Sequence, residues 1–209
     1  MKTPLNTARL RQHFLYSWWK YVLLAALALF FWNIVFSVTA YRAPAHLKVN
    51  LYAYCYGDQD KLTADLEHIR QTEMSDMEEM YSVFMSPDDT YGPMQLMTYV
   101  AAAEGDLYVL DKDSYQSYAS QSLFIPLEGV VEELGLEEQG TSLERAWRKE
   151  TETGERHLFG IPMNYLPGFS AYASINLNNY YIGVAANSGN EENTVKLLKI
   201  LYRDLSAAK

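Results

Sequence analysis

The sequence predicts an α/β fold, in which a mostly parallel sheet flanked by helices follows a single N-terminal transmembrane helix. Three observations support this prediction. Strand-like and helix-like segments alternate after residue 47, which is typical of parallel sheets with crossover helices. Leu107–Leu110, LYVL, is apolar without alternation, as in a strand covered on both faces. Residues 21–40 form an uncharged run of 20 residues, long enough to cross a hydrocarbon core of about 30 Å.

The first half of the chain supplies the alternation. Apolar and β-branched runs mark the strands, and apolar residues at helical spacing mark the helices between them. We expect the helix that opens at Pro93 to stop at Gly105, because proline suits a first turn and glycine a C-terminal stop. The expected segments are strand Lys48–Tyr54, a helix carrying Leu62, Leu66 and Ile69, strand Met80–Met85, helix Pro93–Glu104, strand Leu107–Leu110 and helix Ser114–Ser120.

The second half is less regular. The capping-box spacing from Thr141 to Glu144 predicts a helix start, and His157–Ile161 and Tyr180–Ala186 read as strands. Asn190 is expected to cap a long final helix. Without internal repeats or a low-complexity linker, residues 41–209 are predicted to form one domain.

The N-terminal region predicts a topology. Residues 1–40 contain four basic residues and no acidic one. By the positive-inside rule, residues 1–20 are expected in the cytoplasm, 21–40 in the cell membrane and 41–209 outside. The alternative is a cleaved signal peptide, because Val38-Thr39-Ala40 fits a small-residue cleavage site. The long, Trp- and Phe-rich run favours the anchor.

Charge and cysteine content exclude several functions. Residues 41–209 hold 13 of the 17 basic residues and all 26 acidic residues, a net charge of −13. Such a domain repels phosphate backbones, which argues against nucleic-acid binding. A single cysteine, Cys55, excludes an internal disulfide framework and a Cys-rich zinc site, and the four histidines lack metal-ligand spacing. No cofactor, metal site or catalytic residue is predicted.

Candidate site residues follow the strand ends, because ligands of α/β sheets lie beyond the carboxyl ends of the strands. Tyrosines and acids suit sugars or cationic groups. The alternative is structural: Asp58 and Asp113 would cap helices, and the tyrosines would be half-buried. The candidate ligand- or partner-binding residues are Tyr56, Asp58, Asp111, Asp113, Asn164 and Tyr165.

Three segments together resemble an extracytoplasmic solute-binding protein of the ABC-transporter class. The first is Ala101–Val130, in which Gly-Asp precedes a strand, an acidic turn and a step like Leu-Pro-Leu. The second is Gly154–Pro162, GERHLFGIP. The third is Tyr181–Tyr202, which reads as a strand, an Asn-Ser turn and a helix. The resemblance implies a fold like that of one lobe (domain 1) of such a protein. Only some 20 residues separate Pro162 from the strand at Tyr181, so the second lobe is expected to be absent.

These features predict a bacterial-type, membrane-anchored, non-enzymatic binding or accessory module. Without a second lobe, hinge closure cannot seal a small solute, so we expect weak ligand binding or a protein partner that supplies the other wall. Two alternatives remain open. One is a metal-dependent glycosyltransferase that uses Asp111-Lys112-Asp113, a D-x-D pattern. The other is a direct solute receptor for an ABC importer.

Overall fold

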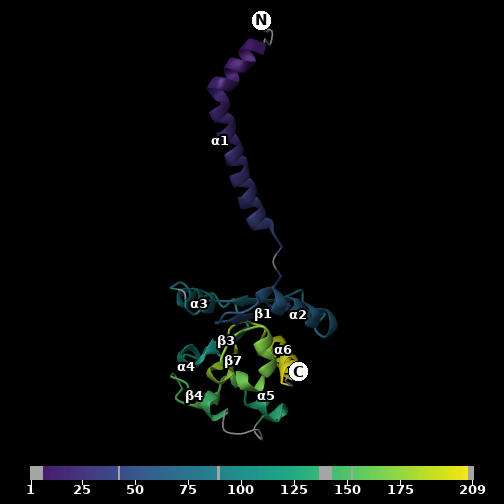
Figure 1. The fold of residues 1–209 in the computed structure, drawn as a ribbon, viewed down its shortest axis with the longest axis vertical. Helices are drawn as coiled ribbons and strands as arrows, with labels where there is room; N and C mark the ends of the chain where they lie inside the picture. The colour runs from purple at the N-terminus through teal and green to yellow at the C-terminus, as the bar shows by residue number, and fades with distance from the viewer. Residues whose placement is uncertain (1–6, 42, 89, 137–142, 152, 207–209) are drawn as a thin grey trace. The chain divides into compact units, whose positions relative to one another are not determined.

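The chain forms two compact units, Met1–Arg42 and Ala43–Lys209, which are described separately. The computed structural model describes residues 7–41, 43–88, 90–136, 143–151 and 153–206 (Figure 1). The first unit is one helix, α1 (Thr7–Thr39). The second unit is a mixed α/β domain that holds the hydrophobic core.

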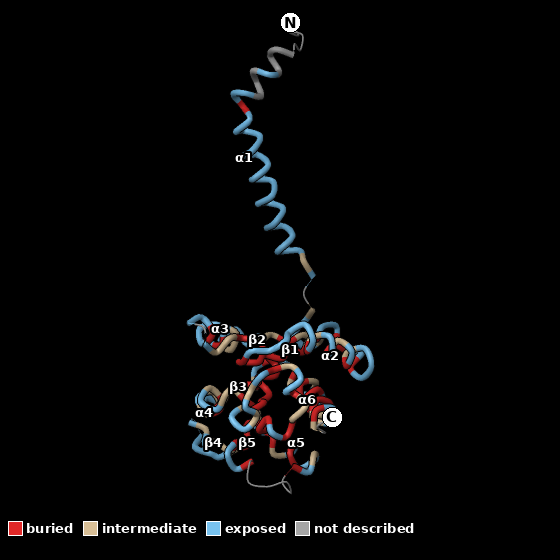
Figure 2. Tube along the Cα trace, in the orientation of Figure 1, coloured by how far each residue is buried: buried red, intermediate tan, exposed pale blue. Residues whose placement is uncertain are grey.

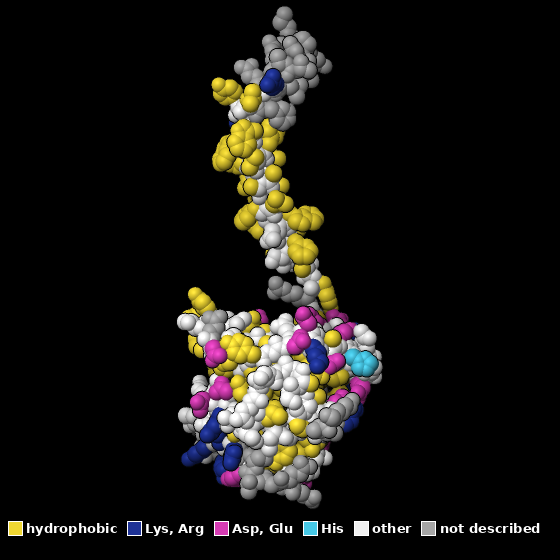
Figure 3. All heavy atoms as spheres, viewed as in Figure 1, with side chains coloured by type: hydrophobic (Ala, Val, Ile, Leu, Met, Phe, Trp, Pro, Cys, Tyr) yellow, Lys and Arg dark blue, Asp and Glu magenta, His cyan; other side chains and the backbone are white. Residues whose placement is uncertain are grey.

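Helix α1 has the length and composition of a membrane span. Its stretch Leu15–Thr39 has a mean hydropathy of 2.2 over its most apolar window, none of which is buried. Twenty-five helical residues extend about 37 Å, more than the hydrocarbon thickness. Apart from buried Ser17, Figure 2 shows the helix almost entirely exposed along this stretch, and Figure 3 shows its apolar side chains. A membrane anchor and a signal sequence both fit this helix, which begins well before the predicted start at Tyr21.

The domain is built on a five-stranded sheet with the order β2-β1-β3-β7-β6. Strand β1 pairs in parallel with β2 and β3, while β7 pairs antiparallel with β3 and β6. Four strands therefore run in one direction and β7 runs against them, which confirms the predicted α/β class. The strands are β1 (Lys48–Ala53), β2 (Glu79–Phe84), β3 (Leu107–Asp111), β6 (Ile161–Pro162) and β7 (Tyr180–Val184).

Helices cover both faces of the sheet, and its strands form the centre of the core (Figure 2). Helix α2 packs on one face, where the Thr63 hydroxyl lies 2.9 Å from the Ser82 hydroxyl of β2. Helices α3 and α4 pack on the other, through the rings described below. The helices are α2 (Gln59–Thr72), α3 (Gly92–Ala101), α4 (Lys112–Ala119), α5 (Glu128–Glu133) and α6 (Glu191–Leu205).

A row of aromatic rings crosses the face that α3 and α4 cover. Tyr52 and Tyr108 are register partners on β1 and β3, and their ring centroids lie 5.7 Å apart. Centroid distances of 4.5–7 Å are favourable for such pairs. The row runs from Tyr99 on α3 to Tyr181 on β7, with successive centroid distances of 4.7, 5.7, 6.3, 5.9 and 4.5 Å through Tyr99, Tyr52, Tyr108, Phe124, Tyr115 and Tyr181.

The segment predicted as one strand, His157–Ile161, is two strands in different sheets. Strand β5 (Arg156–Leu158) pairs with β4 (Trp147–Lys149), whereas β6 joins the main sheet. The chain changes sheets at Gly160, where a Cβ atom would lie 2.7 Å from the Tyr115 ring and 2.9 Å from the Ile182 carbonyl oxygen. Only glycine allows this close approach.

The end of α3 and the role of the Asn190 side chain at the start of α6 differ from the predictions. Helix α3 ends at Ala101 rather than Glu104, because Ala103 takes a left-handed conformation with φ of 52°. Asn190 precedes α6, but its side chain donates to the Lys48 carbonyl oxygen at 2.6 Å instead of capping the helix. The side chain thus ties the final helix to β1.

The predicted capping box lies partly outside the described residues, since it includes Thr141. Its described residues, Leu143 and Glu144, begin a short 3-10 helix, Leu143–Ala146, which strand β4 follows. The predicted α-helix is therefore replaced there by a tight turn and a strand.

The six methionines between residues 74 and 97 divide into two groups. Four of them are buried, namely Met74, Met77, Met80 and Met85. Met94 and Met97, both on α3, are 65% and 63% exposed.

Candidate functional site

The predicted edge of the sheet exists. Strands β1, β2, β3 and β6 share one direction, so their carboxyl ends lie along the same edge. Tyr56 follows β1, and its hydroxyl oxygen lies 2.8 Å from Ser86 Oγ in the segment after β2. Asp111 ends β3, and Asn164 follows β6.

Asp111, not Asp113, caps helix α4. Its Oδ1 accepts hydrogen bonds from the backbone N–H groups of Asp113 and Ser114, at 2.9 and 3.2 Å. Its Oδ2 accepts from Ser114 Oγ at 2.6 Å. The prediction that Asp113 is the cap is wrong, because α4 begins at Lys112, two residues earlier than expected. The Asp113 carboxylate is exposed and does not cap the helix.

Asp58 has the structural role that its position suggested. Its carboxylate accepts from the backbone N–H of Lys61 at 3.0 Å and caps α2. Its own N–H donates to the Tyr172 carbonyl oxygen at 2.8 Å. Asp58 therefore anchors a helix start to the segment after β6.

The last two predicted residues differ in accessibility. Asn164 is exposed, whereas Tyr165 is only 6% exposed. Both belong to the 3-10 helix Met163–Tyr165, which directly follows β6. A buried Tyr165 ring contributes packing rather than a contact surface for a ligand.

A cavity of about 300 Å³ opens at this edge between the first turns of α3 and α4. Sequence reasoning found only one of its residues, Asp113. The signal that could have found Ser117 is its helical spacing of i+4 from Asp113, which places both on one face of α4. The lining residues are Tyr54, Pro93, Leu96, Asp113, Ser114, Ser117 and Tyr118.

The cavity combines hydroxyl groups, one carboxylate and apolar walls. Burial, followed by the neighbouring Asp111 charge, raises the pKa of Tyr54, and burial raises that of Tyr118. Nearby Tyr180 has its pKa raised to about 12, mainly by burial. These phenols stay protonated at neutral pH and can donate hydrogen bonds. Such a set suits a neutral, hydroxyl-rich or amine-bearing group.

The metal-dependent alternative finds no support in this geometry. Among the described residues, no group of three His, Cys, Asp or Glu side chains could hold a metal ion. Both Asp111 carboxylate oxygens already accept hydrogen bonds within α4. Cys55 is 1% exposed and burial raises its pKa to about 12, which keeps it an unreactive thiol.

Solved structures that resemble the chain are solute-binding proteins. Maltose-bound MalE3 of T. maritima matches at 21% identity and a TM-score of 0.40, over 56% of this chain and 28% of that one. An extracellular solute-binding protein family 1 from Alicyclobacillus acidocaldarius matches at 15% identity and a TM-score of 0.38, over 58% of this chain and 29% of that one. The N-glycan transport solute-binding protein NgtS of Streptococcus pneumoniae, in complex with Man1GlcNAc, matches at 13% identity and a TM-score of 0.36, over 56% of this chain and 24% of that one.

The expected resemblance is thus found as partial matches, and the chain spans less than a third of each of those proteins. No protein-family model and no curated protein matches the chain.

Proposed function

We propose that this protein is a membrane-anchored binding module whose binding face is the carboxyl edge of its sheet. The observation that carries the proposal is the cavity between α3 and α4, which presents Asp113, Ser117 and Tyr118 beside an apolar wall. In this proposal residues 1–20 are cytoplasmic, 21–40 span the membrane and 41–209 form the extracytoplasmic domain.

The size of the cavity supports a partner protein. About 300 Å³ is at the lower limit of small-molecule sites, which bury most of the surface of their ligand. A solute held against one wall stays largely in water and binds weakly. A protein that covers the edge would bury Tyr56, which is 52% exposed, and would close the cavity.

A thermal-shift screen of the whole protein in detergent separates this function from a direct solute receptor. Sugars, peptides and polyamines would be titrated against the parent and Ser117→Trp, which fills the cavity from an exposed position. We expect at most millimolar responses from the parent, absent in the variant. A micromolar response that Ser117→Trp abolishes would overturn the need for a partner wall and favour the receptor.

A further inference from the structure

The outer face of helix α3 is a surface feature that the proposed function does not use. The sequence of this helix, GPMQLMTYVA, contains no charged residue. The other described helices of the domain with eight or more residues, α2, α4 and α6, all carry acidic and basic side chains. A helix that faces only water normally has a charged outer face.

The outer face of α3 is apolar instead. Leu96 is buried against the domain, whereas Met94 and Met97 are 65% and 63% exposed. Tyr91, just before the helix, is 71% exposed. These three residues are spaced by three, so they form one ridge along the helix. We call this ridge the α3 ridge.

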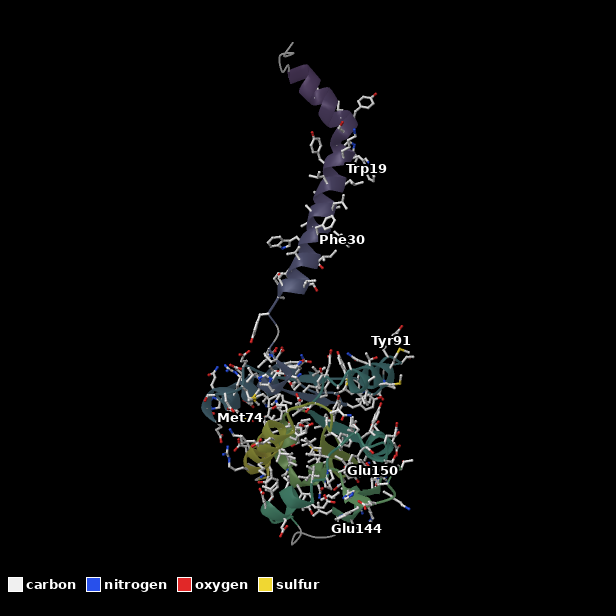
Figure 4. All side chains as sticks on the ribbon, turned by 180° about the vertical axis from the view of Figure 1, so that it is seen from behind. Trp19, Phe30, Met74, Tyr91, Glu144 and Glu150 are labelled. Atoms are coloured by element: carbon white, nitrogen blue, oxygen red, sulfur yellow. The ribbon has the colours of Figure 1, made fainter. Side chains whose placement is uncertain are left out.

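The α3 ridge lies on the side of the domain where the chain joins it. Figure 4 shows Tyr91 projecting from the same side as residues 43–47, and Figure 1 places α3 on that side as well. Glu144 lies at the opposite side of the domain (Figure 4). Five residues, 40–44, separate α1 from the 3-10 helix Ala45–Leu47. Fully extended, they reach about 17 Å.

We propose that the α3 ridge docks on the lipid interface next to the membrane span, which holds the domain flat against the bilayer. The inference rests on the proposed function, because it requires α1 to be an anchor. A tether this short keeps the joining side of the domain within reach of the headgroups, where methionine and tyrosine side chains partition favourably.

The charges around the ridge predict the kind of lipid. Asp88 precedes the helix and Glu104 follows it, and both are exposed. The domain as a whole is acidic, so basic-patch adsorption to anionic lipid does not operate here. The docking is therefore apolar, and it is strongest on zwitterionic lipid.

Bromolipid quenching of the full-length protein in phosphatidylcholine nanodiscs tests this proposal. A fluorophore would be attached at Met94→Cys, at Met97→Cys and, as the control on the opposite side, at Glu144→Cys. Native Cys55 is buried, so unsubstituted protein serves as the blank. We expect roughly twofold quenching at the two α3 positions, because interfacial side chains insert about 5–10 Å. Glu144→Cys should show none.

A second variant guards against chance proximity. In a Gln95→Cys reporter, adding Met94→Glu and Met97→Glu places charges on exposed positions and should abolish the quenching while the domain stays folded. In the reporter without the Glu substitutions, replacing half the lipid with anionic phosphatidylglycerol should reduce the quenching.

Equal quenching at the α3 and Glu144 positions would overturn the docking while leaving the anchor intact. So would contact between two α3 ridges, detected as a disulfide between Met94→Cys copies. A chain that fails to enter nanodiscs would overturn the anchor, and the docking with it.

Discussion

At the scale of single residues, Asp106 links protonation to stability. The side chain is 3% exposed at the start of β3, and its Oδ2 accepts from the Asn50 N–H at 2.7 Å. Desolvation by burial outweighs this hydrogen bond and that of Ser188, so the pKa rises from 3.8 to about 6. The folded domain thus pays a cost for keeping this carboxylate ionised at neutral pH.

This cost predicts a pH dependence. Between pH 3.8 and 6 the folded protein binds a proton that the unfolded chain lacks, so the contribution of Asp106 favours folding at low pH and is lost as the pH rises through 6. A difference of two pKa units is worth about 3 kcal/mol. Relative to Asp106→Asn, the parent should lose up to about that much free energy of unfolding from pH 4 to pH 7. Urea denaturation at both pH values measures this loss. A difference between parent and Asp106→Asn that is the same at both pH values would contradict the raised pKa of Asp106.

The cap of α4 gives a second prediction for individual residues. Asp111→Ala removes three hydrogen bonds from the first turn, which should lower the free energy of unfolding by about 1 kcal/mol. Asp113→Ala, two residues away and exposed, should change it by less than about 0.5 kcal/mol. Thermal unfolding of the pair decides which aspartate is the cap, and the reverse order would restore the original prediction.

At the scale of elements, β7 depends on one glycine. Gly183 lies opposite Tyr108, and a Cβ atom there would lie 2.9 Å from the Phe124 ring and 3.0 Å from the Phe159 carbonyl oxygen. Gly183→Ala should therefore destabilise the domain by about 1–3 kcal/mol. Gly129→Ala in α5 meets nothing within 4 Å and should stabilise by up to about 1 kcal/mol. Equal effects in denaturant unfolding would show that the aromatic row tolerates crowding.

The elements also show what local patterns reveal. The apolar run at Leu107–Leu110 identified the central strand, because burial on both faces leaves a continuous signature. The change of sheet at Phe159-Gly160, between β5 and β6, has no such signature in the sequence. The two-residue strand β6 exists only through its pairing with β7, a tertiary effect. The exposure of Met94 and Met97 could not be predicted either, because periodicity identifies a helix face but not what covers it.

At the scale of the whole domain, the sequence located the edge but not the cavity. Strand direction brought Tyr56, Asp111 and Asn164 to one edge, as a parallel sheet requires. Tyr54, Leu96 and Tyr118 line one cavity only through the tertiary placement of α3 and α4, and no sequence motif records that placement. Asp113 lines the cavity, whereas Asp111 caps α4.

The most direct test of the central claim is site-specific photocrosslinking in the native membrane. A photoreactive amino acid would replace Tyr56 or Ser117 at the carboxyl edge and, as the matched control, exposed Lys149 on β4. If the edge is a binding face, both edge positions should yield one and the same protein adduct, and the control should yield none. Adducts absent from the edge, or equal at all three positions, would contradict the account.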